Sequence, residues 1–490
     1  MRMNYLFKFL PLIIIYRKRD TLEVEIPKIS LNKELRIEVL IAMSDNISHK
    51  IHKALKVRLY PSEEQKVILN KTFGCCRVVY NERLSEHIEY YNTYKDNLDK
   101  PKFKGTLPKE LRETKYPWLG DNTIAEALIQ SLRNCESAYS NFFKSLKKQR
   151  NGRKVGYPKF KSKKQHKDSF TLYSIRKEGL VDFKARTIFI PKLKDTKFRI
   201  ANSSLKSKWL QWFLEARPLS MTISRNTCGE YYCSILLERE QDVIQNISLS
   251  NSVGLDFSPN NLYVDNNNNI APNYKSYKQL NKKKLKKLQR NLSRKQKGSN
   301  NWEKARTKQA RLEKHLSDSR RDYIEKETLR LVRTYDIIGI EDLNLQGMMK
   351  FSHNARNYVD TSWYTFTQKL IWKSQFNNCL VIKSDRFYPS SKTCNNCGYV
   401  NHNLTLKDRK WTCPNCGSEI IRDENAGKNL RDNAINLLVD EIISTLGMGR
   451  TEVMSMEGME VNLLNGMICG VSCEVESQSS DALKEAFCFS

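Results

Sequence analysis

Residues 391–430 read SKTCNNCGYVNHNLTLKDRKWTCPNCGSEIIRDENAGKNL, and this stretch decides how the rest of the chain is interpreted. It holds two Cys-x-x-Cys pairs, Cys394 with Cys397 and Cys413 with Cys416, separated by 15 residues. Four thiolates at this spacing predict a ribbon whose two tight turns hold one structural zinc ion, Zn²⁺. A catalytic zinc is disfavoured because all four ligand positions are filled. A redox dithiol is the alternative, and His402 in the intervening loop is a possible substitute ligand.

The same stretch carries an acid, Asp423, seven residues beyond the last cysteine and at the start of a predicted helix. Two more acids lie on apolar strands, Asp256 within one and Glu341 at the end of another. A carboxylate in apolar surroundings is costly unless a cation pairs with it, so the three together indicate a divalent metal site. Each acid taken alone is explained as well by a surface or helix-capping role. Other nearby acids could replace one of the three: Asp265, Asp342 and Asp385.

The three acids are 85 and 82 residues apart, so only a folded domain can bring them together. A strand hairpin, a further strand with the second acid and a late helix with the third resemble the RNase H arrangement of RuvC nucleases. Two Mg²⁺ ions about 3.5–4 Å apart, held by Asp256, Glu341 and Asp423, would activate water for phosphodiester hydrolysis. The sequence therefore predicts catalytic magnesium, as two ions, at the acids and structural zinc at the cysteines.

The composition indicates a polyanionic partner. The chain has 490 residues, with 84 Lys and Arg against 54 Asp and Glu, and a formal net charge of +30. This excess favours nucleic acid over an anionic membrane surface. The longest apolar run, Leu6–Tyr16, contains Lys8 and Pro11 and is too short to span a bilayer, so we expect no membrane partner.

The cysteines and the first 42 residues bear on location. Thirteen cysteines, scattered apart from the ribbon, favour a reduced, intracellular protein over a secreted one. We expect it to be cytoplasmic and nucleoid-associated. An apolar stretch follows Arg2, but Arg17, Lys18 and Arg19 come next and no small-residue cleavage site does. We expect residues 1–42 to be a dispensable leader, with Met43 as the working start.

The first half of the chain reads as a β unit split by helices. Leu55, Val57 and Leu59 alternate with basic residues in a strand over 53–60, and Ser62 with Gln65 forms a capping box. The chain then reads as helical to about residue 149. A period of two returns at 170–173, 187–190, 221–224 and 231–237, followed by a polar linker at 241–252.

Two basic regions suit a nucleic acid. Near 141–164, Lys and Arg alternate with aromatic rings that could stack on bases, although a solvated helix with core aromatics explains the same pattern. Residues 275–333 hold 21 Lys and Arg against 6 Asp and Glu, with leucines at helical spacing and a break at Gly298. This second region predicts a basic helical hairpin. The tail beyond Leu446 lacks periodicity and is expected to be weakly ordered.

Four motifs of the chain closely resemble TnpB proteins, which are encoded by insertion sequences and are similar to the ancestors of compact type V CRISPR nucleases. They are Val253-Gly254-Leu255-Asp256, Ile338-Gly339-Ile340-Glu341-Asp342-Leu343, Phe387-Tyr388-Pro389-Ser390-Ser391-Lys392-Thr393-Cys394 and Arg422-Asp423-Glu424-Asn425-Ala426. The similarity covers roughly 53–438, and its upstream matches include Gly156-Tyr157-Pro158-Lys159-Phe160.

The resemblance implies an RNA-guided DNA endonuclease with Asp256, Glu341 and Asp423 as its RuvC acids. A guide RNA from the transposon end would select the target double-stranded DNA by base pairing. The implied fold is α+β and multidomain, with a wedge β-barrel at 43–60 and 168–245 split by a helical recognition domain at 61–167. A RuvC-like nuclease domain would follow at 246–390 and 419–445, with the zinc ribbon inserted at 391–418. Residues 1–42 and 446–490 would lie outside this core.

Three other functions remain open at this point. A transposase would use the same two-metal geometry for strand transfer instead of hydrolysis. A nuclease-dead, RNA-guided DNA-binding repressor would need no acids, yet all three positions carry one. A zinc-ribbon nucleic-acid binder without catalysis leaves the two acids on strands unexplained.

Overall fold

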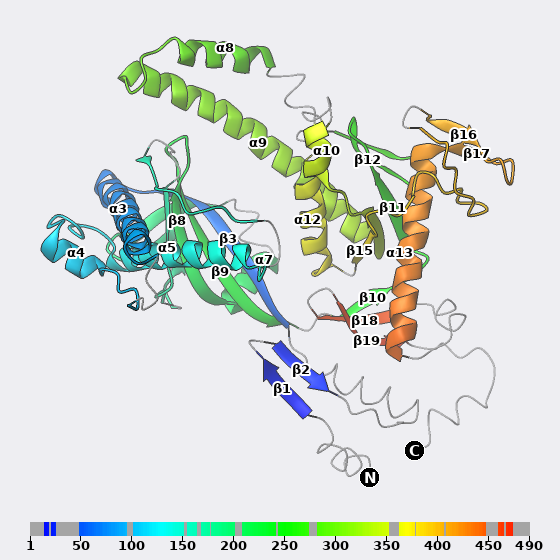
Figure 1. Ribbon diagram of the computed structural model, residues 1–490, viewed down its shortest axis with the longest axis horizontal. Helices are drawn as coiled ribbons and strands as arrows, with labels where there is room; N and C mark the ends of the chain where they lie inside the picture. The colour runs from blue at the N-terminus through cyan, green and yellow to red at the C-terminus, as the bar shows by residue number, and fades with distance from the viewer. Residues whose placement is uncertain are drawn as a thin grey trace. The chain divides into compact units, whose positions relative to one another are not determined.

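The computed structural model divides the chain into two compact units (Figure 1). One comprises His49–Gln241 and Ser276–Ser319, and the other Met1–Ser48, Asp242–Lys275 and Arg320–Ser490. Helices and sheets occur in both, so the predicted α+β class is confirmed. No helix among the described residues is long and apolar enough to cross a membrane. The structure describes residues 14–18, 21–25, 49–95, 101–150, 154–163, 168–176, 178–200, 208–241, 244–273, 282–351, 362–377, 379–405, 408–446, 459–464 and 467–473.

A seven-stranded antiparallel sheet is the core of the unit that contains His49–Gln241. Its central strand β3 (His49–Tyr60) pairs with β9 from His49 to Leu59 and with β7 at its end. The predicted alternation is confirmed, because Leu55, Val57 and Leu59 are buried and the residues between them are exposed. The strand order is β4-β8-β9-β3-β7-β6-β5, with β4 (Asp168–Leu172), β5 (Val181–Asp182), β6 (Thr187–Ile190), β7 (Lys194–Arg199), β8 (Arg217–Arg225) and β9 (Tyr231–Gln241).

The helices of this unit begin at the predicted capping box. Ser62 accepts a hydrogen bond from the Gln65 amide (3.2 Å), and the Gln65 side chain accepts one from the Ser62 amide (3.0 Å). The helical stretch that follows is not continuous, because residues 101–107 and 115–124 interrupt it. Buried residues of its two long helices pack together, among them Tyr80, Leu84 and Cys135. The helices are α3 (Glu63–Tyr94), α4 (Pro108–Thr114), α5 (Ala125–Leu146) and α7 (Lys208–Glu215).

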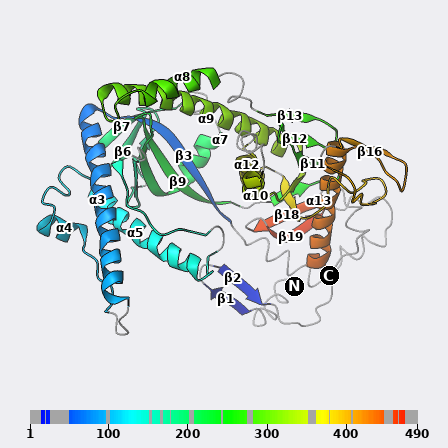
Figure 2. The ribbon, with the colours of Figure 1, turned by 45° about the horizontal axis from the view of Figure 1, so that its top comes forward.

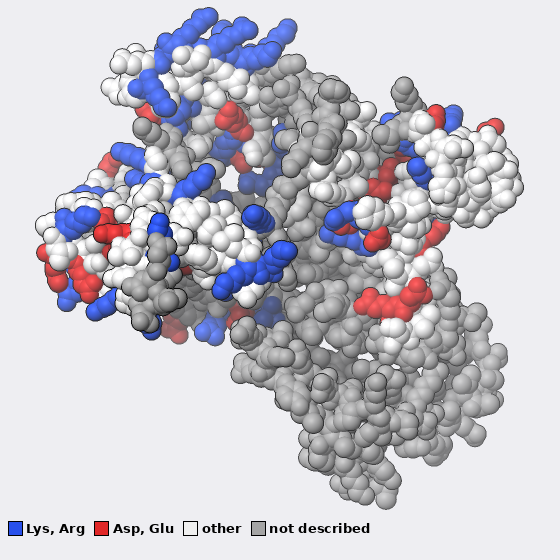
Figure 3. All heavy atoms as spheres, in the orientation of Figure 1, with Lys and Arg blue, Asp and Glu red and all other residues white. Residues whose placement is uncertain are grey.

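The predicted basic helical hairpin is confirmed as α8 (Lys282–Ser293) and α9 (Asn300–Thr334). Leu285 and Leu288 of α8 pack against Leu312 and Leu316 of α9, so the apolar stripe is used within the hairpin. Lys and Arg side chains gather over α8 (Figure 3). Within the described chain, no ion pair involves a Lys or Arg of 283–297. Helix α8 and the turn after it therefore expose basic side chains that are not paired with any acid that the structure describes, whereas several basic residues of α9 pair with acids of the same helix.

The second unit is built on a five-stranded sheet of order β13-β12-β11-β14-β15. The hairpin of β11 and β12 is antiparallel, whereas β14 and β15 add to β11 in parallel. The strands are β11 (Ser252–Phe257), β12 (Asn261–Asp265), β13 (Ile270–Pro272), β14 (Ile337–Glu341) and β15 (Leu380–Ser384). Helix α13 (Arg422–Leu446) lies alongside β11 in both ribbon views (Figures 1 and 2).

The two faces of this sheet are covered by different helices. Val253, Leu255 and Phe257 of β11 pack with buried residues of α9 and of α12 (Trp363–Ser374). Residues of α13 pack instead against Ile337 and Leu380, at the start of β14 and β15. Side chains alternate along a strand, so Gly254 and Asp256, which lie between these three residues of β11, face α13. The alternation therefore selects which residues of β11 and β14 lie under that helix.

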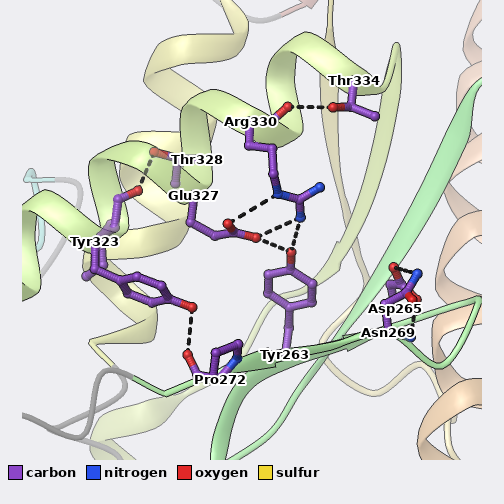
Figure 4. A network of polar contacts seen from close by, with 10 residues as sticks. Tyr263, Asp265, Asn269, Pro272, Tyr323, Glu327, Thr328, Arg330 and Thr334 are labelled. Carbon is purple, nitrogen blue, oxygen red and sulfur yellow. Dashed lines mark hydrogen bonds and ion pairs between the residues drawn. The ribbon is translucent and has the colours of Figure 1, made fainter.

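A polar network around the buried Tyr263 fastens α9 to this sheet (Figure 4). The Tyr263 hydroxyl of β12 donates to Glu327 (2.5 Å) and accepts from Arg330 (2.8 Å). Arg330 also pairs with Glu327 at 2.7 Å, and the Tyr323 hydroxyl donates to the Pro272 carbonyl. A phenol inside the core is tolerated because both of its hydrogen-bonding roles are satisfied.

The structure corrects two of the predicted irregular regions. The expected linker at 241–252 contains a strand, β10 (Ile244–Ile247), and the expected weakly ordered tail contains β18 (Met459–Leu464) and β19 (Met467–Cys473). These three form one sheet of order β10-β18-β19. Their pairing joins segments about 200 residues apart in sequence, which local periodicity does not detect. In residues 1–42, only a hairpin of β1 (Ile14–Lys18) and β2 (Thr21–Glu25) is described.

Other differences concern strand content and domain division. Strand β7 was not expected, because only Thr196 and Phe198 of its six residues face inward. The predicted nuclease domain included the basic hairpin, whereas Ser276–Ser319 groups with the unit of the seven-stranded sheet. Two contacts explain this grouping: Arg306 donates to the Thr227 carbonyl (2.9 Å), and Lys314 pairs with Glu230.

Candidate active site and metal centre

The acids Asp256 and Glu341 lie at equivalent ends of neighbouring parallel strands. In the register of β11 and β14, Gly254 is opposite Gly339, and Leu255 is opposite Ile340. Each acid follows one residue later, on the face that α13 covers. Asp423 is the second residue of α13. The structure thus brings together three residues that are far apart in sequence.

Glycines set how closely α13 approaches the strands. A Cβ atom on Gly254 would overlap the Gly427 carbonyl oxygen, and one on Gly339 would overlap the Leu430 carbonyl oxygen. On the helix side, a Cβ on Gly427 would lie 2.7 Å from the Asn266 amide nitrogen. These contacts are between backbones, which cannot move aside as a flexible side chain can. The helix that carries Asp423 is therefore held directly against the strands that carry the other two acids.

The electrostatics agree with this convergence. Burial, and then the carboxylates of Glu341 and Asp423, raise the pKa of Asp256 well above its ordinary value, while Arg422 and Arg409 act in the opposite direction. Burial also raises the pKa of Glu341, against the effect of a hydrogen bond from Ser390. Carboxylates that resist ionisation side by side are a suitable donor set for a divalent cation, which relieves their repulsion.

Each of the other two acids has defined partners. The Ser390 hydroxyl donates to Glu341 at 2.5 Å. Asp423 pairs with Arg409 of the ribbon at 3.0 Å and with Arg422 at 3.1 Å. In the described part of the chain, only the four cysteines bring at least three possible ligand atoms within 4.8 Å of one another. The three acids are therefore electrostatically coupled without forming so compact a cluster.

The acids considered as replacements have structural partners of their own. Asp265 accepts from the Asn267 and Asn269 amides in the turn after β12. Asp342 pairs with Arg386 at 2.6 Å, and Asp385 accepts from the Phe387 amide. These hydrogen bonds explain the three carboxylates without a metal.

The four ribbon cysteines have the arrangement that a tetrahedral zinc site needs. The sulfur atoms of Cys394 and Cys416 are 3.7 Å apart, and those of Cys397 and Cys413 are 3.6 Å apart. Zinc–sulfur bonds of about 2.3 Å would place tetrahedral sulfurs about 3.8 Å apart. None of the four forms a disulfide. Hydrogen bonding with Ser418 lowers the pKa of Cys416 to about 6, which favours the thiolate that metal binding requires.

The two knuckles are built alike. The Gly398 amide donates to the Cys394 carbonyl (2.8 Å) and the Gly417 amide to the Cys413 carbonyl (2.9 Å), both glycines having positive φ. Strands β16 (Lys410–Thr412) and β17 (Glu419–Ile421) pair beside the second knuckle. His402 is exposed and is not part of the sulfur cluster.

Asparagine side chains fasten the first knuckle to α13. Asn425 accepts from the Asn395 amide (3.0 Å) and donates to the Thr393 carbonyl (2.7 Å). Asn429 donates to the carbonyls of Ser390 and Thr393, each at 2.7 Å. Because Asn425 is two residues from Asp423, the first turn of α13 both holds the ribbon and carries the third acid.

Several of these contacts were not anticipated from sequence. Ser390 and Arg422 lie within the motifs quoted above, and Arg422 directly precedes Asp423, so closeness in the chain is a weak signal for them. Arg409 offers no such signal, because it is 14 residues from Asp423 and the fold of the ribbon brings them together. The asparagines are polar residues on a helix and could equally have faced solvent.

Comparison with protein families gives three matches. A family described as "Probable transposase" matches residues 235–352, and one described as "Cas12f1-like, TNB domain" matches residues 363–430. A family described as "Helix-turn-helix domain" matches residues 51–96, which here form β3 and α3. The second match covers the ribbon and the start of α13.

Curated relatives and solved structures complete the comparison. A Streptomyces pristinaespiralis protein named "Putative RNA-guided DNA endonuclease" is 30% identical over 382 residues, covering 78% of this chain and 89% of its own. The Escherichia coli (strain K12) protein InsQ, with the same descriptive name, is 29% identical over 77% of this chain and 91% of its own. A TnpB-like protein, L79, of Acanthamoeba polyphaga mimivirus is 23% identical over 76% of this chain. A structure of a Cas12f1–sgRNA–target DNA complex covers 78% of this chain and 99% of its own, with a TM-score of 0.46 and 13% identity. Because the similarity to the Streptomyces protein extends over most of both chains, this protein belongs to the TnpB family.

Proposed function

We propose that this protein is an RNA-guided DNA endonuclease of a transposable element that cuts its target by metal-dependent phosphodiester hydrolysis. The observation that carries the proposal is the convergence of Asp256, Glu341 and Asp423 where α13 crosses β11 and β14. The proposal that a guide RNA and a DNA target are its partners is based on the names of the relatives.

The sheet supports a RuvC-like assignment of the second unit. An antiparallel hairpin followed by two parallel strands, with the acids on adjacent strands and on a late helix, has the order of an RNase H-like fold. The seven-stranded sheet interrupted by α3 to α5 supports the wedge and recognition assignment of the first unit. The domain boundaries stated above stay predictions.

The catalytic metal would be Mg²⁺ held by Asp256, Glu341 and Asp423. When bound, two such ions would activate a water and stabilise the leaving 3′-oxygen. The chain's own residues prepare the ligands for this chemistry. The Ser390 hydroxyl orients the Glu341 carboxylate, and the backbone contacts of Gly254 and Gly339 fix the helix that carries Asp423. Burial raises the pKa of both Asp256 and Glu341, so a bound cation would relieve the cost of ionising them.

The ribbon would hold structural zinc on Cys394, Cys397, Cys413 and Cys416. The sulfur spacing fits that ion, and with four protein ligands the site leaves no position for a substrate. Its task in the proposal is to shape the approach of DNA to Asp423, through Arg409 and the asparagine contacts with α13.

The net charge of +30 suits a guide RNA and a DNA duplex bound at once. Target choice would come from base pairing with the guide, and the protein would recognise only a short flanking motif and the shape of the heteroduplex.

The decisive experiment is cleavage of a plasmid by protein purified with its copurifying RNA. RNA sequencing identifies the guide, and a plasmid carrying the matching target is incubated with Mg²⁺. We expect double-strand breaks at the target, abolished in Asp256→Asn and without Mg²⁺. Binding of the target without any cut by the wild type would instead favour a guided repressor.

A second candidate is DNA strand transfer, favoured by the family described as a probable transposase. The same acids serve either reaction, and the products separate them. Covalently joined DNA ends in the plasmid assay would overturn hydrolysis as the physiological reaction.

A further inference from the structure

One aromatic side chain near the acids is more exposed than any other large apolar side chain that the structure describes. Phe387 is 87% exposed, whereas the next large apolar side chain in the described chain, Leu214, is 64% exposed. Burying a phenylalanine ring stabilises a fold, because it removes a large apolar surface from water. Leaving it in water gives up that stabilisation of the fold, which calls for an explanation at this position.

The backbone that carries this ring is held by hydrogen bonds on both sides. The Phe387 amide donates to the Asp385 side chain (2.8 Å), and the Tyr388 amide donates to the Asp385 carbonyl (3.1 Å). Arg386 pairs with Asp342 at 2.6 Å. The ring therefore extends from a well-fastened turn between β15 and the ribbon.

The turn also contacts the candidate active site. Ser390, which donates to Glu341, is three residues after Phe387. Three residues span at most about 11 Å between Cα atoms. Adjacent nucleotides on one strand of B-DNA rise about 3.4 Å. The ring thus lies within a few nucleotides of any phosphate presented to Glu341.

We propose that Phe387 is a stacking site for an unpaired base of the DNA strand that enters the active site. The ring would bind a base within a few nucleotides of the phosphate to be cut and fix the strand's position along the acids. The inference rests on the proposed nuclease function and adds a strand-positioning residue to it.

A base fits this surface better than a protein does. No other residue of 383–392 is an exposed large apolar side chain, so the turn offers one flat ring. A stable protein interface buries about 800 Å² on each partner, far more than one ring supplies. Stacking on a single aromatic ring is worth about 1–3 kcal/mol per base and tolerates any sequence. Such tolerance is what a nuclease needs when a guide RNA chooses the target.

The test uses the full-length protein with its copurifying RNA and a matching target. 2-Aminopurine replaces single bases along each target strand in turn, and its fluorescence reports stacking. Binding is measured in the Asp256→Asn background, so no cut occurs. We expect quenching at one or two adjacent positions, lost in Phe387→Ala and Phe387→Leu and kept in Phe387→Trp.

Cleavage by proteins with Asp256 intact is the second readout. Phe387→Ala and Phe387→Leu should cut about 5- to 100-fold more slowly and at more scattered positions, and Phe387→Trp should cut like the wild type. The control is Leu437→Ala, which removes an exposed apolar side chain 14 residues along α13 from Asp423, about 21 Å away. It should alter neither readout.

The outcomes separate this inference from the proposed function. Unchanged quenching and cutting in Phe387→Ala, or full activity in Phe387→Leu, would overturn the stacking site. A wild type that binds and quenches but never cuts would overturn the nuclease while keeping the stacking site. Absence of quenching at every position would overturn the stacking site whether or not DNA is cut.

Discussion

At the scale of single residues, the environment of Asp256 predicts how the stability of the folded protein changes with pH. Burial and two like charges raise its pKa, so the folded protein holds its proton to higher pH than the unfolded chain does. Without a metal, stability from this group is greatest at low pH and falls as pH rises above about 4, where an unfolded aspartate ionises. Asp256→Asn removes the ionisable group and should abolish that loss.

We therefore expect Asp256→Asn to raise Tm in EDTA at pH 8 by about 2–4 °C, the shift that 1 kcal/mol gives in a domain of this size. The difference should shrink toward pH 4, and DNA cutting should fall roughly 100-fold or more. Thermal melts from pH 4 to 8.5, with EDTA or Mg²⁺, are the measurement. A lower Tm of the variant in EDTA at pH 8 would contradict the assignment of repulsion at this site.

Sequence reasoning could select Asp256, Glu341 and Asp423 as candidates because each follows a local pattern. Strand periodicity and a helix start are visible within ten residues. The contacts of Ser390 and Arg409 are products of the tertiary fold, since each depends on where a turn or ribbon lies over the sheet. The pairing of β10 with β18 was missed for the same reason.

At the scale of elements, the packing of α13 on the sheet predicts an unusual sensitivity to a single methyl group. Gly339→Ala places a Cβ against the Leu430 backbone, which has no room to yield. We expect a loss of about 1–3 kcal/mol, as for an overpacked core, together with loss of DNA cutting. Urea unfolding and the plasmid assay measure the two effects.

The matched control for that glycine is Gly156→Ala, because a Cβ at Gly156 would meet nothing within 4 Å. It should be neutral or slightly stabilising. Equal effects of the two substitutions would show that close backbone contact does not explain Gly339.

The ribbon makes a second prediction at this scale. Cys413→Ser should lower the zinc content from about one ion per chain to near zero and lower Tm, because metal binding and folding are coupled. Elemental analysis and thermal melts measure this. Cys228→Ser, in the turn between β8 and β9, is the control and should keep its zinc. Full zinc content in Cys413→Ser would exclude the ribbon as the metal site.

At the scale of the whole molecule, Lys and Arg outnumber Asp and Glu, and in the part of the chain that the structure describes no Lys or Arg of α8 from Lys283 onward forms an ion pair. Replacing Lys283, Lys287 and Arg290 by Gln should weaken RNA binding and reduce the slope of log K against log salt by up to about 0.9 per lost phosphate contact. Fluorescence anisotropy of labelled guide RNA and of DNA at several salt concentrations would measure both.

The control changes the charge equally by replacing Lys66, Lys109 and Lys326, which pair with Glu63, Glu113 and Asp322. We expect a smaller change in slope from these three. Identical slopes for the two triple variants would mean that only net charge matters and that the hairpin has no special part.

The opposed glycines Gly254 and Gly339 also bear on how such proteins lose activity. Each stands two residues before an acid, but only the glycines are required for α13 to pack on the sheet. Selection for folding and selection for DNA cleavage therefore act on different residues of the same motif. A descendant selected only for guided DNA binding should retain both glycines while its acids are free to change. A relative with both glycines but without the acids would therefore be identified as a nuclease that has lost its activity.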